Sequence, residues 1–129
     1  MPIRIVQLGT DRLSGEGLRI GTVRRPPRGV PKSEYATRNF YDVWLPDLSP
    51  SPDVIAEYQR SEGGEAAWRK LERRYRAEMK APEKTRLLAL LAALSHTTSF
   101  SVGCYCDDER RCHRSILRSL LRECGAELD

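Results

Sequence analysis

Reactive side chains are concentrated near the end of the chain, where three of the four cysteines and one of the two histidines fall within ten residues. Zinc prefers thiolate and imidazole ligands, and a thiolate is also the nucleophile of cysteine enzymes. Arginines beside them could bind an anion through paired hydrogen bonds. This segment is the first candidate for a functional site, and its members are Cys104, Cys106, Arg110, Cys112, His113 and Arg114.

The spacing Cys-x-Cys-x5-Cys-His argues against a metal ion. Two thiolates on one zinc ion lie about 3.8 Å apart, whereas residues i and i+2 of a strand have Cα atoms roughly 6.6 Å apart. Cys104 and Cys106 could share an ion only where the strand has already turned. Cys112 and His113 would point about 100° apart on a helix. The sequence therefore predicts no metal at this segment and no stoichiometric zinc in the purified protein.

A reactive cysteine is the second chemistry that this segment could support. Cys104 and Arg110 have the C-x5-R spacing of the phosphate-binding loop of cysteine phosphatases. The residues at 107–109 are all acidic, and their carboxylates would repel a phosphate and raise the pKa of a thiol. We therefore interpret the matching spacing as a coincidence.

Anion binding without covalent chemistry is the third possibility. The acidic residues 107–108 are expected to cap the final helix, whose first N–H groups favour an anion. Arg110, His113 or Arg114 could complete a site for a phosphate or a carboxylate. The alternative is that Cys112 packs as a small apolar group and the basic residues simply lie on the surface.

The elements that must position this segment form an α/β pattern. An apolar, β-rich run at 98–105 leads through the acidic turn into a helix over 109–124, and Gly125 ends that helix. Residues 2–8 and 18–23 are predicted as further strands. The length of 129 residues fits a single domain. We expect three layers, with a small, largely parallel sheet that carries helices on its faces.

A proline-rich loop at residues 24–32 carries further arginines. Parallel strands bring the loops at their carboxyl ends to one edge of the sheet, so Arg24 and Arg28 are predicted to face His113 and Arg114 across a pocket. The like charges would need an anion or nearby carboxylates between them. The alternative is a solvated loop at the opposite edge.

The middle of the chain is predicted to be helical. Ser51 and Pro52 have the residue types of a helix start. Residues 65–80 form an amphipathic helix with apolar positions at helical spacing and arginines on the other side. That basic side is the basis of an alternative function, nucleic-acid binding. Residues 83–95 are apolar nearly all round, so this helix should be well buried.

Composition limits the partners that the protein can have. A net charge of +4 permits a phosphate-bearing partner without requiring one. The longest apolar run, residues 87–94, is too short to cross a bilayer, so we expect no membrane partner and a cytoplasmic protein. Cysteines in that reducing compartment are expected to be thiols or ligands rather than disulfides. The residues specify no cofactor.

Four blocks of sequence, taken together, carry a family resemblance. They are Gly17-x-Arg19-Ile20 with Arg24-x-x-Pro27-Arg28-Gly29, Trp44 with Leu48-Ser49-Pro50-Ser51, Trp68 with Arg74-Tyr75-x-x-Glu78, and Cys104 with Cys112-His113-Arg114. In this order they resemble the DUF488 family (domain of unknown function 488), YeaO-like branch. Val23 and Pro26 depart from that branch, which has Asp and Trp there. The resemblance implies a compact α/β domain, favours the site residues Arg24, Arg28, His113 and Arg114, and implies no substrate.

The sequence thus leads to one functional hypothesis and one rival. The hypothesis is that the protein binds a phosphate-bearing small molecule or nucleotide at the strand-to-helix turn after Cys104. The residues do not decide whether the ligand is also processed. A pocket with converging Arg and His side chains would favour this function, whereas a clustered basic face without a pocket would favour nucleic-acid binding by residues 65–80.

Overall fold

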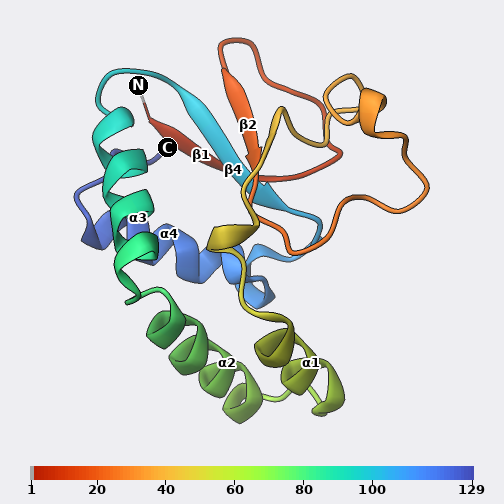
Figure 1. The fold of residues 1–129 in the computed structure, drawn as a ribbon, viewed down its shortest axis with the longest axis vertical. Helices are drawn as coiled ribbons and strands as arrows, with labels where there is room; N and C mark the ends of the chain where they lie inside the picture. Colours follow the sequence, from red (N-terminus) through yellow and green to blue (C-terminus); the bar gives the residue numbers. More distant parts are fainter. Residues whose placement is uncertain (1) are drawn as a thin grey trace.

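A sheet of four parallel strands lies at the centre of the fold in the computed structural model, which describes residues 2–129 (Figure 1). The strands are β1 (Ile3–Gln7), β2 (Leu18–Gly21), β3 (Val43–Trp44) and β4 (Phe100–Cys104). The helices are α1 (Pro52–Arg60), α2 (Glu65–Glu78), α3 (Pro82–Leu94) and α4 (His113–Glu123), with short 3-10 helices η1 (Lys32–Glu34), η2 (Pro46–Leu48) and η3 (Glu109–Arg111). The predicted α/β class with a parallel sheet is confirmed.

The strand order places the cysteine-containing turn near the middle of the sheet. The order is β1-β4-β2-β3, so β4 lies between β1 and β2. Every residue of β4 is buried, as expected for a parallel strand that is covered on both faces. The turn that follows Cys104 therefore emerges between the loops that follow β1 and β2, at the edge where α/β proteins bind ligands.

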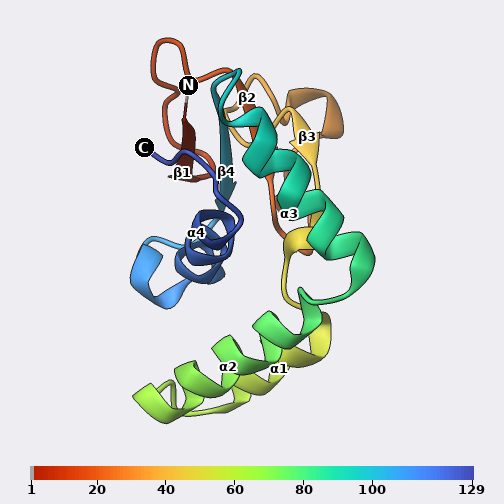
Figure 2. The same ribbon diagram turned by 90° about the vertical axis from the view of Figure 1, so that its left-hand side faces the viewer.

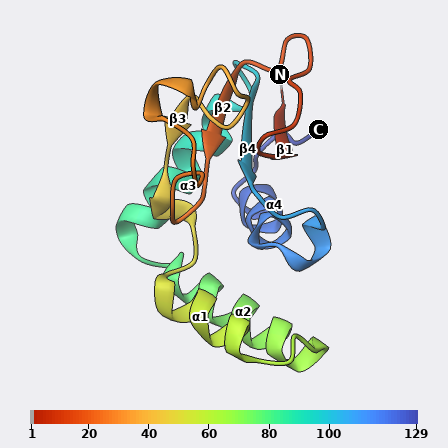
Figure 3. The ribbon, with the colours of Figure 1, turned by 90° about the vertical axis from the view of Figure 1, so that its right-hand side faces the viewer.

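Helices α3 and α4 pack on one face of the sheet, and α1 and α2 lie side by side below it (Figures 2 and 3). α3 and α4 contact each other there, and the core beneath them includes Val102 of β4 and Leu117 of α4. Loops cover the opposite face, where Tyr41 packs with Leu8 and Val23. The layers are therefore a helical layer, the sheet and a loop layer, rather than helices on both faces.

The apolar helix α3 is less buried than its composition predicts. Leu88 and Leu91 face the core, but Leu90 and Leu94 are 53% and 39% exposed. α3 belongs to the outer layer of the fold, so only one side of it meets the sheet and α4. The expectation of a well-buried helix is therefore wrong, because composition does not show how many neighbours a helix has.

Local signals correctly predict the start of α1. The Ser51 hydroxyl accepts a hydrogen bond from the Val54 N–H at 3.4 Å, and Pro52 is the first helical residue. Proline is tolerated there because the first N–H groups of a helix have no partner within it. Among residues 2–129, no helix has both the length and the apolar character that a membrane span requires.

The last helix begins later than predicted. Residues 109–111 form the separate 3-10 helix η3, and α4 starts only at His113. Asp108 accepts a hydrogen bond from the Arg110 N–H at 3.0 Å, so it caps η3 and not α4. The residue that precedes α4 is Cys112, whose extended backbone separates the two helices.

A buried arginine joins the loop layer to the sheet. The Arg19 guanidinium is fully buried and donates to both carboxylate oxygens of Glu16, at 2.8 and 3.0 Å. It also donates to the carbonyls of Thr10 and Asn39 at 2.7 and 2.8 Å. Gly17 has a φ of +81°, and a side chain there would overlap the backbone that leads into β4. The buried ion pair of Arg19 and Glu16 therefore holds the loop after β1 against β2 and against the segment before β3.

Acid should destabilise this loop layer. Burial alone would raise the pKa of Glu16 and Asp42, but hydrogen bonds and charge from Arg19 and Arg12 outweigh burial and hold both pKa values below their ordinary 4.5 and 3.8. The unfolded chain then takes up protons first as the pH falls. The stabilisation is complete above the unfolded pKa values and is lost as the pH falls through the lower folded values.

Urea unfolding at a series of pH values measures this effect. The midpoint should change little between about pH 7 and pH 5 and should fall below about pH 4.5. Asp42→Asn, which removes one of the two titrating carboxyls, should make the fall shallower. A midpoint that stays constant down to about pH 3 would contradict the prediction.

Candidate functional site

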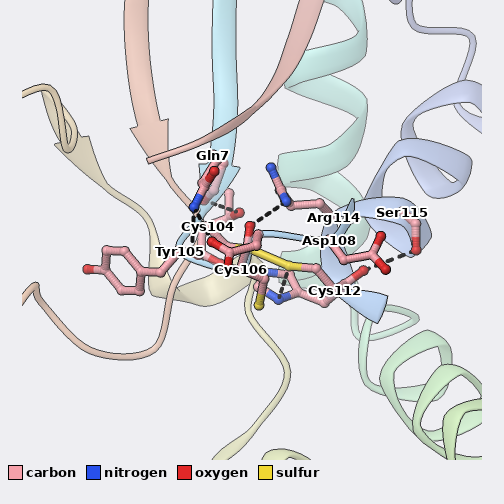
Figure 4. The surroundings of a disulfide bond; sticks show 12 residues. Gln7, Cys104, Tyr105, Cys106, Asp108, Cys112, Arg114 and Ser115 are labelled. Carbon is pink, nitrogen blue, oxygen red and sulfur yellow. Dashed lines mark hydrogen bonds between the residues drawn. A yellow bond between two sulfur atoms is a disulfide. The ribbon is translucent and has the colours of Figure 1, made fainter. Parts of the chain in front are cut away.

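The turn between β4 and α4 carries the cysteine cluster, defined as Cys104, Cys106 and Cys112 (Figure 4). A disulfide joins Cys104 at the end of β4 to Cys112 before α4. Cys106 is a free, exposed thiol, and the three sulfur atoms lie within 4.8 Å of one another. The expectation of thiols or ligands rather than disulfides is therefore wrong for Cys104 and Cys112 in this structure, because the turn brings their buried side chains to one point.

The two geometric premises against a shared metal do not hold. β4 ends at Cys104, so the chain has already turned before Cys106 and the strand spacing does not apply. Cys112 has φ −125° and ψ 147°, which is extended backbone, so Cys112 and His113 are not successive helical residues. Extended backbone lets the Cys112 side chain point back toward Cys104. The predicted absence of a metal has therefore lost its geometric basis, and only metal analysis can test it.

His113 points inward from the first turn of α4. Its Nε2–H donates to the carbonyl oxygen of Thr22, just after β2, at 2.7 Å. Burial lowers the pKa of His113 to about 4, helped by the charges of Arg114 and Arg24 and opposed by the hydrogen bond to Thr22. The ring is therefore neutral at pH 7, with an unprotonated Nδ1 4.0 Å from the sulfur of Cys112. His113 thus offers a lone pair at this position, not a positive charge.

Arg114 is a buried cation beneath the turn, with 4% of its surface exposed. One of its terminal nitrogens, Nη2, donates to the carbonyl oxygen of Cys106 at 2.6 Å (Figure 4). Its Nε is buried and has no hydrogen-bond partner among residues 2–129. The nearby carboxylate of Glu109 is instead paired with Arg118 at 2.8 Å. Arg114 therefore holds the backbone of the cysteine turn. Its Nε–H and its positive charge remain available there for a further hydrogen bond or a negatively charged group.

The other predicted arginines donate their hydrogen bonds elsewhere, although Arg24 lies close enough to His113 for its charge to lower the pKa of that ring. Arg24 donates to the carbonyl oxygens of Ser49 and Pro50, at 3.0 to 3.3 Å, and so ties two loops together. The Arg110 side chain is 90% exposed and pairs with Asp108 at 3.3 Å. The disulfide-bonded, buried Cys104 and the outward-pointing Arg110 cannot form a phosphatase-like loop, in agreement with the interpretation of the C-x5-R spacing as a coincidence.

A groove lies beside the cysteine cluster, between the loop after β2 and the turn after β4. Its volume is about 820 Å³, and its lining is Arg25, Pro26, Pro27, Arg28, Phe40 and Tyr105. The Tyr105 hydroxyl donates to the carbonyl oxygen of Arg25 at 2.9 Å, which fastens the loop to the turn. The rings of Phe40 and Tyr105 meet edge to face, with centroids 6.2 Å apart. Figure 4 shows Tyr105 pointing away from the cysteines that flank it.

Of the predicted site residues, only Arg28 lines this groove, and Arg25, Phe40 and Tyr105 were not among the predicted ones. Tyr105 stands next to the last residue of β4, where the chain leaves the sheet, and this position is the one signal that points to it. Phe40 lies far from Tyr105 in the sequence. Tertiary contacts bring the two rings together: the carbonyl oxygen of Asn39 accepts from the Gly9 N–H just after β1, and β1 pairs with β4.

Comparisons with known proteins decide the family. A family model described as the active DUF488-N3 subclade, DUF488-N3a, matches residues 3–125. The chain belongs to the DUF488 family. No curated protein and no solved structure matches the chain.

Two departures of this DUF488 chain from the YeaO-like pattern have visible places in the structure. Val23, which stands where that pattern has Asp, is buried against Leu8 and Tyr41 in the core under the loop layer. Pro26, which stands where the pattern has Trp, lines the groove. The groove of this DUF488 chain is thus bounded by rigid prolines and by aromatic rings from other segments.

The basic side of α2 is largely neutralised by carboxylates. Arg69 pairs with Glu65 along the helix, and Lys70 and Arg74 both pair with Glu57 of α1. Arg76 pairs with carboxylates of α2 and α4. These pairs leave α2 with little unpaired positive charge for a phosphate backbone.

Proposed function

We propose that the groove binds a phosphate-bearing aromatic ligand of the nucleotide class. The observation that carries this proposal is the pairing of two exposed arginines, Arg25 and Arg28, with two aromatic rings, Phe40 and Tyr105, around one groove. This moves the predicted site from the start of α4 to the outer side of Tyr105. The proposal concerns binding and assigns no reaction.

Each part of the groove matches one part of a nucleotide. A nucleobase stacks on aromatic rings, and such stacking contributes about 1–3 kcal/mol per base. A guanidinium group binds phosphate oxygens through two parallel hydrogen bonds. Pro26 and Pro27 restrict the backbone between the two arginines, so less conformational entropy is lost when both engage one ligand.

Tyr105 is suited to hold the groove in shape. Burial raises the pKa of Tyr105 well above its ordinary value, and the neighbouring tyrosines Tyr41 and Tyr35 act in the same direction. The phenol therefore stays protonated and keeps its hydrogen bond to the carbonyl of Arg25. A neutral ring in a fixed position provides a stacking surface without repelling a phosphate.

The rival function, nucleic-acid binding by α2, receives less support. Its arginines and lysine are mostly paired with carboxylates, and the residues that line the groove all lie outside α2. A single strand of nucleic acid could still place one nucleotide in the groove, since stacking accepts any base. Variants in the groove and variants on α2 therefore test the two functions against each other.

Titration with a fluorescent derivative of adenosine triphosphate tests the proposal. Tyr105→Leu, which removes the ring, should weaken binding by about 5- to 100-fold, as expected for one stacked base. Arg28→Ala should weaken binding by about tenfold or more and reduce its dependence on salt. Tyr105→Phe keeps the ring and should bind nearly as well as the unchanged protein.

Arg73→Ala on α2 is the matched control for Arg28→Ala, since it removes an arginine from the rival surface. It should leave the affinity unchanged. Weaker binding by Arg73→Ala together with unchanged binding by Arg28→Ala would overturn the proposal in favour of α2. No binding of the probe by the unchanged protein would exclude adenine nucleotides from the groove and count against the proposal.

A further inference from the structure

We infer that the cysteine cluster, once its disulfide is reduced, binds one thiophilic divalent cation such as Zn²⁺, with Nδ1 of His113 as a fourth donor. This site lies on the inner side of the turn, whereas the groove lies on the outer side, and the inference does not depend on the proposed function. Four points of geometry and charge support it.

The sulfur of Cys106 already lies at nearly the distance from the other two sulfur atoms that a metal site needs, and reduction frees the two bonded sulfur atoms to separate. All three lie within 4.8 Å of one another, and about 3.8 Å separates two thiolates on one tetrahedral zinc ion. The Cα atoms of Cys104 and Cys112 are 7.8 Å apart, outside the range of roughly 4.4–6.8 Å usual for disulfides. This backbone separation leaves room for an ion between the two sulfur atoms.

The fourth donor is prepared by its hydrogen bond. Histidine ligands of metals commonly donate their second ring N–H to a carbonyl or carboxylate, which fixes the tautomer and the orientation of the ring. His113 does so through Nε2 to the carbonyl of Thr22. Its free Nδ1 lies 4.0 Å from the sulfur of Cys112, close to the separation of two ligands on one ion.

The buried charge beneath the turn has the sign that such a site requires. Three thiolates and one divalent cation carry a net charge of −1. Arg114 is a buried cation whose Nε has no partner among residues 2–129. Its Nη2 already donates a hydrogen bond to the carbonyl oxygen of Cys106. An anionic metal cluster would compensate the buried guanidinium, which otherwise carries a desolvation cost.

The oxidised and the metal-bound forms exclude each other. A phosphine reductant attacks the disulfide and transfers two electrons to it. Water supplies the oxygen of the phosphine oxide and the two protons of the thiols that form. Binding of the cation then displaces one proton from each of the three thiols. The oxidised protein retains only Cys106 from the cluster, so it should not bind the ion tightly.

Titration of the phosphine-reduced, metal-free protein with Co²⁺, followed by displacement with Zn²⁺, tests the inference. We expect one ion per chain, a thiolate-to-cobalt charge-transfer band, and release of nearly three protons per ion at a pH where the thiols are protonated. Zn²⁺ should also raise the melting temperature of the reduced protein, because it binds only the folded state. The oxidised protein should show none of these effects.

Two cysteine variants make the test specific. Cys106→Ser removes a ligand without affecting the disulfide and should weaken Co²⁺ binding by at least about 100-fold. Cys124→Ser removes the exposed thiol outside the cluster and should bind as the unchanged protein does. The inference is overturned by no thiolate band in the reduced protein, by equal binding of the oxidised protein, or by Cys106→Ser binding as well as Cys124→Ser.

Discussion

Glu16→Gln should destabilise the protein by about 3–5 kcal/mol, which is the usual effect of removing one partner of a buried ion pair. The Arg19 guanidinium is fully buried and forms two of its hydrogen bonds to the carboxylate of Glu16. Without that carboxylate, its positive charge stays inside the protein and the guanidinium donates only to neutral groups, because the neighbouring carboxylate of Asp42 is paired with Arg12. Chemical unfolding in urea, followed by circular dichroism, measures the loss.

Glu123→Gln is the matched control for this substitution. Glu123 also pairs with an arginine, Arg76, at 3.0 Å, but its side chain is 59% exposed. Water screens such a pair, so the substitution should change the stability by less than about 1 kcal/mol. If Glu16→Gln costs no more than Glu123→Gln, the buried pair does not hold the loop layer in place.

Leu117→Ala should destabilise the protein by about 2–5 kcal/mol. Leu117 of α4 is completely buried in the core that the helical layer forms against β4. Truncation of its side chain removes apolar contacts and leaves a cavity that the surrounding side chains fill only in part. The shift of the urea midpoint, at an unchanged slope, measures this effect.

Leu90→Ala makes the same chemical change on the exposed side of α3. Leu90 is 53% exposed, and alanine is a better helix former than leucine. The stability should therefore change by no more than about 0.5 kcal/mol. A large loss at Leu90 would mean that this side of α3 is covered in the folded protein, which would contradict the observed layer arrangement.

The sequence by itself determined those elements whose signals are local. Ser51 and Pro52 specify the start of α1, because a hydroxyl cap and a residue without an N–H act within one helical turn. The short β-rich run at residues 98–105 predicts a buried strand, and every residue of β4 is buried. Gly125, with a φ of +84°, ends α4 in a conformation that glycine adopts without strain.

The tertiary structure alone decided the features that depend on distant contacts. Cys112 is extended rather than helical, and this one backbone conformation brings its sulfur to Cys104 and Cys106. The pairing of β2 with β4 places Tyr105 against the loop of Arg25 and Arg28 and so forms the groove. Each of these contacts joins segments that lie apart in the chain. The packing of the sheet sets the distance between such segments, and their spacing in the sequence does not predict it.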